Sequence, residues 1–271
     1  MPFNTVCSMI LLRSLAILLF LGHSITAFSQ QTIPFVMCYE DRQLLPYFAG
    51  EGKQVPKESP GVSIEILQIL DMEQPEITIS FRREPWKRCL VLLEVGDISG
   101  VIASYKVSRH KIGKYPMVGD TPDESRAFEI TRYCLYTKTN SNFIWNGVSF
   151  ESKVALPIAI PLGYSIADLF KTNDIQITDV NSSDRGFFLL KHERVSGTAT
   201  LCESGSQILI QNEEYFDIKE NEIPLRTKGS YLLISHQFYE QHPKISQQLW
   251  TNIVSINQRI YQEIYQRYVN E

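Results

Sequence analysis

The sequence lacks a surplus of positive charge, which limits the partners it can have. Its 271 residues include 26 Lys and Arg against 30 Asp and Glu, a formal net charge of -4 at pH 7. Such a chain has no general attraction for a nucleic-acid backbone or an anionic lipid surface, because both are negatively charged themselves. We therefore expect no nucleic acid as a partner.

The usual sequence signatures of metal and phosphate sites are also missing. The five histidines occur in no HxH or HExxH pattern, so the sequence predicts no metal site. The GxGxxG and P-loop patterns are absent too, which removes the usual signals for a bound nucleotide. We expect no cofactor.

Long apolar runs are scarce outside the N-terminus. Residues 9–22 are mostly apolar, but the uninterrupted run within them, Leu15 to Leu21, is far shorter than the roughly 20 residues of a membrane-spanning helix. Ala27 and Ser29 place small residues at the -3 and -1 positions of a cleavage site after Ser29. We expect a signal peptide over residues 1–29 and export to the periplasm; an uncleaved N-terminal anchor is the alternative.

Cysteine is rare, with five in the chain. Cys7 falls in the expected signal peptide, and the other four show no CxxC spacing of a metal or redox site. Four cysteines in an exported protein can form disulfides, in any of three pairings. Each nevertheless lies in an apolar run, so buried free thiols are an equally good interpretation for Cys38, Cys89, Cys134 and Cys202.

From Ile33 onward, short β-like runs alternate with helix-like runs, and this predicts an α/β fold with mostly parallel sheets. The expected strands are Ile33–Tyr39, Ile77–Phe81, Ile98–Ala103, Phe128–Tyr136, Val154–Ile160, Thr198–Cys202 and Tyr231–Ser235. One expected helix begins at Pro60-Gly61, and two more cover Lys87–Val95 and Ser165–Phe170. A long helix ends the chain, and its apolar face consists of Leu249, Ile253, Ile256, Ile260, Ile264 and Tyr268. After the signal peptide, the remaining length suits two lobes of about 100 residues each.

The segment Gly163-Tyr164-Ser165 lies between an expected strand and an expected helix. It is similar to the nucleophile elbow of hydrolases, with Ala167 in place of the last glycine of that motif. Free backbone N–H groups and the positive end of a helix at such a turn also suit a ligand carboxylate or phosphate. Anion binding is the interpretation we favour, with helix capping by Ser165 and nucleophilic catalysis as alternatives.

Trp86 follows the second expected strand within a group of cations. A large aromatic residue at the C-terminal end of a strand in an open α/β sheet stands where such folds bind ligands. We expect Arg82 and Lys87 to be solvated. Packing within or between the lobes is the alternative role for Trp86.

The segment from Trp86 to Pro116 reads WKRCLVLLEVGDISGVIASYKVSRHKIGKYP. It resembles the family 3 periplasmic solute-binding proteins, in which a helix ends in Leu-x-x-Gly-x-Ile/Val-Asp-Gly before a strand and a Ser/Thr-rich loop that contains an arginine. The order of elements fits nearly all of the chain after residue 29. The resemblance implies a two-lobed, type II periplasmic-binding-protein-like α/β fold, each lobe having a mixed, mostly parallel sheet flanked by helices. We place lobe 1 at 30–125 plus 226–271 and lobe 2 at 126–225.

The resemblance also implies ligand-binding positions. Arg109 matches the loop arginine that receives an amino-acid carboxylate, for which a bidentate guanidinium is well suited, and Ser104 matches a position that hydrogen-bonds the same ligand. The turn at Gly163, Tyr164 and Ser165 matches the backbone amides that close on the carboxylate from the second lobe. Aromatic residues of the cleft match Tyr47 and Trp86, with Tyr39 and Tyr105 as further candidates.

The family's acidic partner for a ligand ammonium group has no clear match. Ser196 stands where the family has Asp after its Arg-Val pair, and the first acid that follows it is Glu203. Glu40, at the end of the first expected strand, is an alternative partner, or else a solvated loop acid.

The resemblance therefore implies an exported binding protein rather than an enzyme. It would close on a small polar ligand, an amino acid or related carboxylate, and present it to an ABC permease or a membrane sensor. A periplasmic dehydratase-like enzyme acting on a cyclic carboxylic acid is the alternative, with Glu40 or Glu203 as the acid/base group.

Overall fold

The computed structural model describes residues 32–269. The expected signal peptide over 1–29 lies outside these residues. Within 32–269, no helix combines the length and apolar character that crossing a membrane requires.

One mixed sheet runs through the described chain, in the order β2-β1-β3-β11-β6-β9-β7-β8, with β10 paired to β6. Its strands are β1 (Ile33–Glu40), β2 (Ile77–Glu84), β3 (Gly100–Ser104), β6 (Glu129–Lys138), β7 (Ile158–Pro161), β8 (Ile177–Val180), β9 (Gly197–Leu201), β10 (Ile218–Glu220) and β11 (Arg226–Ile234). A small hairpin pairs β4 (Met117–Val118) with β5 (Thr121–Pro122). The helices are α2 (Val62–Glu73), α3 (Trp86–Val95), α4 (Ala167–Thr172), α5 (Ser183–Lys191), α6 (Cys202–Gln211), α7 (His236–Gln241) and α8 (Pro243–Val269), with short 3-10 helices η1 (Val107–Lys111), η2 (Glu124–Arg126) and η3 (Glu213–Tyr215).

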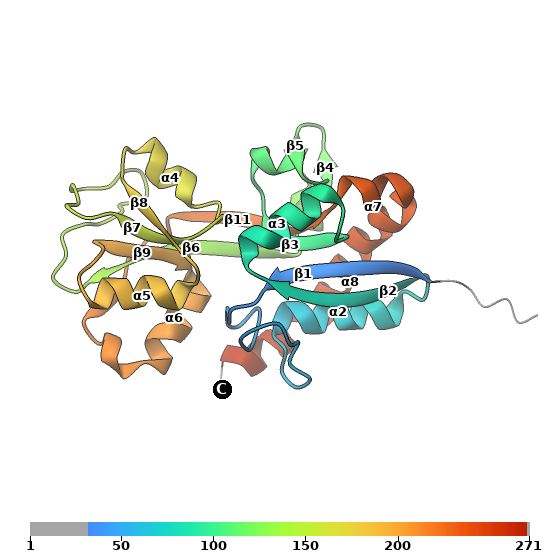
Figure 1. The fold of residues 1–271 in the computed structure, drawn as a ribbon, viewed down its shortest axis with the longest axis horizontal. Helices are drawn as coiled ribbons and strands as arrows, with labels where there is room; N and C mark the ends of the chain where they lie inside the picture. Colours follow the sequence, from blue (N-terminus) through green and yellow to red (C-terminus); the bar gives the residue numbers. More distant parts are fainter. Residues whose placement is uncertain (1–31, 270–271) are drawn as a thin grey trace, which may run out of the picture. The chain divides into compact units, whose positions relative to one another are not determined.

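The sheet is parallel toward its two ends and antiparallel in the middle. Strand β1 pairs in parallel with β2 and β3, and β7 pairs in parallel with β8 and β9. Strand β11 is antiparallel to both β3 and β6, and β6 is antiparallel to β9. The long strands β6 and β11 therefore connect a first half (β1–β5, α2, α3, α7 and α8) to a second half (β7–β10 and α4–α6), as Figure 1 shows.

Local sequence explains where the first helices begin and end. Helix α2 follows Gly61, whose φ of 107° is a conformation that only glycine adopts easily. Helix α3 ends at Gly96, which has a φ of 77° and bonds the carbonyls of Leu92 and Leu93 through its N–H. Both helices, and the glycine that ends α3, confirm the prediction from the sequence.

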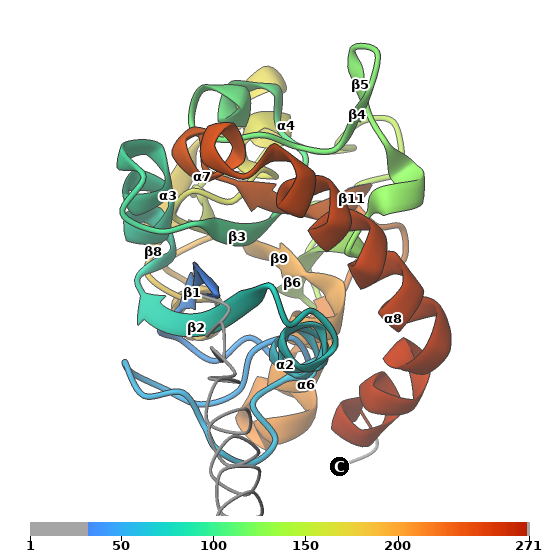
Figure 2. The ribbon, with the colours of Figure 1, turned by 90° about the vertical axis from the view of Figure 1, so that its right-hand side faces the viewer.

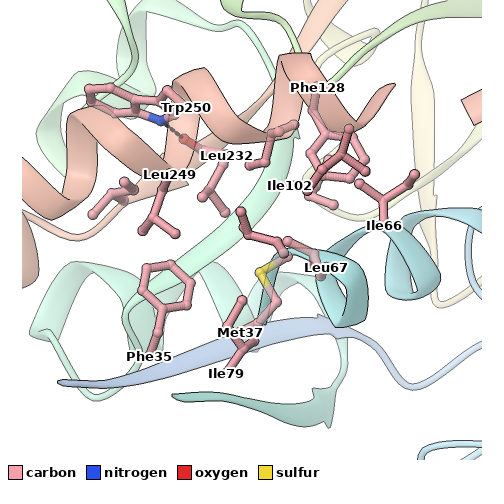
Figure 3. Close-up of a cluster of buried hydrophobic side chains, with 14 of the residues drawn as sticks. Phe35, Met37, Ile66, Leu67, Ile79, Ile102, Phe128, Leu232, Leu249 and Trp250 are labelled. Atoms are coloured by element: carbon pink, nitrogen blue, oxygen red, sulfur yellow. Dashed lines mark hydrogen bonds between the residues drawn. The ribbon is translucent and has the colours of Figure 1, made fainter. Parts of the chain in front are cut away.

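The core of the first half lies between α2, the sheet and α8. Helices α2 and α8 run along the same side of the sheet (Figure 2). Figure 3 shows side chains from β1, β2, β3, β11 and both helices converging, with the indole N–H of Trp250 donating to the Leu232 carbonyl at 2.7 Å. The predicted apolar face of α8 is confirmed from Leu249 to Tyr268, all of it buried except the partly buried Ile260.

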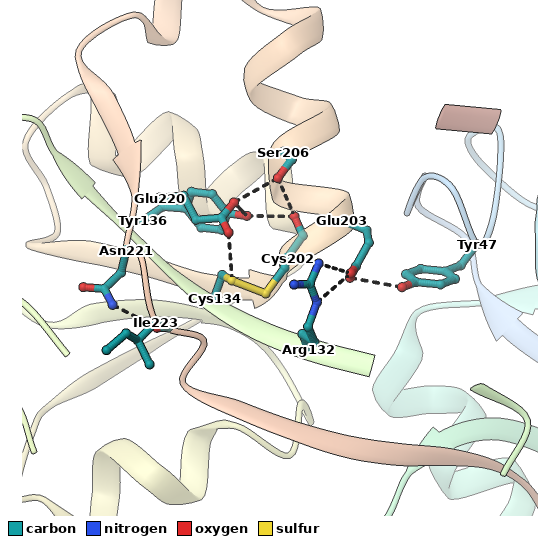
Figure 4. The surroundings of a disulfide bond; sticks show 10 residues. All are labelled: Tyr47, Arg132, Cys134, Tyr136, Cys202, Glu203, Ser206, Glu220, Asn221 and Ile223. Carbon is teal, nitrogen blue, oxygen red and sulfur yellow. Dashed lines mark hydrogen bonds and ion pairs between the residues drawn. A yellow bond between two sulfur atoms is a disulfide. The ribbon is translucent and has the colours of Figure 1, made fainter. Parts of the chain in front are cut away.

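All four described cysteines form disulfides. Cys38 of β1 is joined to Cys89 of α3, and Cys134 of β6 to Cys202 at the start of α6 (Figure 4). The free-thiol interpretation is therefore wrong. The apolar surroundings that favoured it are real, since all four sulfurs belong to buried residues, but a disulfide is itself apolar and packs well in such a place.

Some element boundaries differ from the expectation. The strand expected over Val154–Ile160 begins only at Ile158, because Pro157 has no N–H to donate to a neighbouring strand. The strand expected to reach Cys202 ends at Leu201, where α6 begins. The helix expected over Ser165–Phe170 covers Ala167–Thr172.

Candidate functional site

A cavity of about 50 Å³ lies over the middle of the sheet, with lining residues from both halves. Its polar floor comes from three adjacent strands, with Ser104 on β3, Ser230 on β11 and Glu129 and Thr131 on β6. Its walls are mainly aromatic and aliphatic: Leu44, Tyr47, Phe48, Trp86, Tyr164 and Leu201. Ligand pockets usually measure about 300–1,000 Å³, so this cavity is small for a ligand of several heavy atoms.

The Arg109 side chain joins the two halves at this cavity. It is buried, at 5% exposure. Its Nη1 donates to the Ser104 carbonyl at 2.6 Å and its Nη2 to the Gly163 carbonyl at 2.9 Å. The guanidinium also lies over the Trp86 ring, 5.5 Å from its centroid. A guanidinium has five N–H donors, so this group has further capacity to bind an anion.

Hydroxyl groups surround the same point. Ser104 Oγ lies 2.9 Å from both Ser165 Oγ and the Tyr133 hydroxyl. The Lys228 ammonium group donates to Ser165 Oγ at 3.5 Å, a long contact, and burial lowers the pKa of Lys228. This end of the cavity is rich in donors, as a carboxylate site requires.

The side chain of Ser165 bears on the two alternative interpretations of the strand-to-helix turn, helix capping and nucleophilic catalysis. It makes no capping hydrogen bond to α4, whose N-cap is Ile166, so helix capping is wrong. Its hydroxyl partners in the described chain are Ser104, Tyr133 and Lys228 and include no histidine, so the Ser–His pair of the hydrolase motif is not formed at this turn. Gly163 has a φ of 92°, which turns its carbonyl toward Arg109.

Two carboxyl groups line the cavity, and burial raises the pKa of each. Glu40, at the end of β1, accepts a hydrogen bond from the Tyr164 hydroxyl at 2.8 Å. Burial raises the pKa of Glu40 to about 7, although this hydrogen bond acts to lower it. Glu129, at the start of β6, accepts from the Tyr261 hydroxyl at 3.1 Å, and burial raises its pKa to about 8. Both are therefore poised to change charge near neutral pH.

Glu203 is engaged in a different way. One of its carboxylate oxygens accepts from Arg132 Nη2 at 2.8 Å and Nε at 3.0 Å, and the other from the Tyr47 hydroxyl at 3.1 Å (Figure 4). It is not among the residues that line the cavity. An ammonium group of a ligand at Glu203 would compete with the Arg132 guanidinium, which already donates two hydrogen bonds to this carboxylate.

Comparisons with known proteins support the fold. No protein-family model matches the sequence, and no curated protein matches it. Among solved structures, a substrate binding protein of an amino acid ABC transporter is 14% identical, with a TM-score of 0.65, over 88% of this chain and 100% of that one. The chain has the two-lobed fold of periplasmic binding proteins. The predicted fold class is confirmed.

Two further matches come from proteins with other roles. The GluR0 ligand-binding core of Nostoc punctiforme, in complex with L-glutamate, is 10% identical, with a TM-score of 0.64, over 88% of this chain and 100% of that one. A histidine kinase sensor domain with similarity to periplasmic binding proteins is 13% identical, with a TM-score of 0.64, over 88% of this chain and 96% of that one. At these identities the likeness concerns the fold alone.

In this fold, the structure brings most of the predicted site residues together. Six of them line the cavity: Glu40, Tyr47, Trp86, Ser104, Arg109 and Tyr164. Gly163 and Ser165 adjoin it through their bonds to Arg109 and Ser104. Tyr39 is buried against the Phe48 ring instead. Tyr105 lines a separate open groove of about 870 Å³, together with Lys228.

Four polar residues of the floor were not predicted from the sequence: Glu129, Thr131, Tyr133 and Ser230. A signal for three of them was present, because residues 129, 131 and 133 alternate along one strand and so share a face of the sheet. Their partner Ser230 comes from β11, nearly a hundred residues later in the chain, which no local pattern connects to them.

Proposed function

We propose that the protein binds a small carboxylate-bearing ligand, an amino acid or a related acid, between its two lobes. The observation that carries the proposal is the buried Arg109 guanidinium, which contacts both halves of the molecule at the cavity. A buried cation with unused donors is a natural receiver for a carboxylate. Two proteins of the same fold support the ligand class, since one serves an amino acid ABC transporter and another is bound to L-glutamate.

Binding would take place by opening and closing about β6 and β11, with lobe 1 at 30–125 plus 226–271 and lobe 2 at 126–225. On closure, the ligand carboxylate would replace the Gly163 carbonyl as the acceptor of the Arg109 N–H groups. Ser104 and Ser165 would add hydroxyl donors, one from each side of the cleft. The ligand would leave chemically unchanged.

The location and partner follow from the same proposal. A signal peptide cleaved after Ser29 would deliver the protein to the periplasm, where its closed form would be recognised by an ABC permease or by a membrane sensor. The structural matches include a substrate binding protein of an amino acid ABC transporter and a histidine kinase sensor domain. Either partner would recognise the same closed form.

Substitution of Arg109 tests the proposal. Thermal-shift screening of the protein against amino acids, polyamines and small carboxylates should give stabilising ligands, since a ligand at 100 times its Kd adds about 2.7 kcal/mol. Arg109→Gln should then abolish calorimetric binding of the best ligand while leaving a cooperative unfolding transition. Arg194→Gln, which removes an exposed cation, is the matched control and should bind normally. Unchanged affinity in Arg109→Gln would refute the site.

One observation favours an enzymatic alternative, a dehydratase acting on a cyclic carboxylic acid. Glu40 lines the cavity and burial raises its pKa to about 7, which suits a general acid or base. Recovery of the ligand after prolonged incubation decides between the two. Conversion to a dehydrated product would establish the enzyme, whereas quantitative recovery of unaltered ligand supports binding.

A further inference from the structure

Three carboxyl groups lie at or beside the cavity, and they differ in how far their charge is compensated. Glu203 forms an ion pair with Arg132, which donates two hydrogen bonds to one of its carboxylate oxygens. Glu40 lies near Arg83, whose charge favours the ionised form. None of the residues from 32 to 269 forms an ion pair with Glu129, and its carboxyl group accepts one side-chain hydrogen bond, from Tyr261. Glu40 also accepts one side-chain hydrogen bond, from Tyr164, so what sets Glu129 apart among these three described groups is that no nearby cation favours its ionised form.

Glu129 also has a defined position relative to the carboxylate end of the cavity. Ser104 is directly opposite Ser230 in the β3–β11 ladder, and Ser230 is directly opposite Glu129 in the β11–β6 ladder. All three side chains line the cavity, so they form a row across its floor. Neighbouring strands are about 4.8 Å apart, which puts the backbone at Glu129 roughly 10 Å from the backbone at Ser104.

This spacing does not suit the ammonium group of an α-amino acid. In such a ligand the carboxylate and the nitrogen share one carbon atom, so a nitrogen held beside Ser104 and Arg109 stays over β3. To reach Glu129, the ligand has to extend across β11. The floor offers a polar path for it, because Ser230 lies on β11 between the two ends, and its hydroxyl is 3.1 Å from that of Thr131 on β6.

We infer that Glu129 receives a cationic nitrogen that is separated from the ligand carboxylate by several carbon atoms, as in an ω-amino acid. The inference rests on the proposed function, because it takes a carboxylate at Arg109 and Ser104 as its reference point. Glu129 is then the residue that selects for chain length and for the amino group. Glu203 is left with the role of an ion pair that ties α6 to β6.

A series of straight-chain compounds tests the inference by calorimetry on the protein. The amino series is glycine, β-alanine, γ-aminobutyrate, δ-aminovalerate and ε-aminocaproate, and the matched acids without an amino group are butyrate, valerate and caproate. The wild type should bind one of the three longest amino acids most tightly, by about tenfold or more over the matched acid, since a hydrogen bond to a charged group has that effect.

Variants at Glu129 show whether this preference comes from its carboxyl group. Glu129→Gln should remove the preference for the amino compound while leaving the affinity for the matched acid within about twofold, because only the charge is lost. Glu129→Asp draws the carboxyl group back by about 1.5 Å, and should move the optimum to a ligand one carbon longer. A purely structural role would not produce that shift. The control, Glu240→Gln on the exposed side of α7, should match the wild type.

Several results would overturn the inference. One is tightest binding by glycine. Another is that Glu129→Gln lowers the affinity for the amino compounds and for the matched acids by the same factor. Absence of binding by the whole series also overturns it. In that case the separate thermal-shift screen decides the proposed function, which stands if another carboxylate binds in an Arg109-dependent way and fails if none does.

Discussion

The buried carboxyl group of Glu40 makes stability depend on pH, and replacing it with an amide should remove that dependence. Glu40 is 8% exposed, and burial raises its pKa from 4.5 to about 7. Between these two values the folded protein binds the proton more tightly than the unfolded chain does. The contribution of this proton to the free energy of unfolding is therefore complete below pH 4.5 and is lost as the pH rises through about 7.

The size of the effect follows from the two pKa values. Each pKa unit corresponds to 1.36 kcal/mol, so ionising Glu40 costs the folded state about 3 kcal/mol in total. Most of this, about 2.5 kcal/mol, falls between pH 5 and pH 8. Glu40→Gln keeps an oxygen that accepts from the Tyr164 hydroxyl but cannot ionise. Relative to the wild type, the variant should gain about 2.5 kcal/mol of unfolding free energy over this range.

Urea unfolding followed by tryptophan fluorescence at pH 5 and at pH 8, with the disulfides intact, measures this difference. Other groups that titrate, including Glu129, are present in both proteins and cancel in the comparison. Glu240→Gln, an exposed substitution of the same chemistry, should follow the wild type at both pH values. Parallel stability profiles for Glu40→Gln and the wild type would refute the argument, because Glu40 would then ionise equally well in the folded and unfolded states.

Two further predictions concern the framework around the cleft. Cys134→Ala together with Cys202→Ala should lower the free energy of unfolding by about 4 kcal/mol, because the bridge closes a loop with a sequence separation of 68; a change below 1 kcal/mol in urea unfolding would contradict this. Gly163→Ala should weaken ligand binding and cost about 1–3 kcal/mol of stability, since φ is 92° there and a Cβ would lie 3.2 Å from Trp86. Wild-type affinity and melting temperature in that variant would contradict the assigned turn.

The fold could be predicted from the sequence where local patterns decide it. Alternating apolar runs located the strands, and Gly96 marked the end of α3 where the structure has it. Arg109 and Ser104 were expected from the family resemblance, and both line the cavity, five residues apart on one strand-to-loop segment.

The remaining parts depend on contacts between distant segments. Glu129 gains its position only because β11, from the C-terminal part of the chain, inserts between β3 and β6. The engagement of Glu203 depends on Arg132, which faces it from a neighbouring strand. The disulfide pairing likewise follows from the packing of α3 on β1 and of α6 on β6. Spacing along the sequence carries none of this information.

A crystal structure of the protein with the tightest ligand from the screen would show where the ligand carboxylate binds. We expect the ligand carboxylate within hydrogen-bond distance of the Arg109 guanidinium and Ser104 Oγ, between the two lobes, with the Gly163 carbonyl displaced from Arg109. A ligand bound instead in the separate groove lined by Tyr105 and Lys228, with the bonds of Arg109 unchanged, would contradict it.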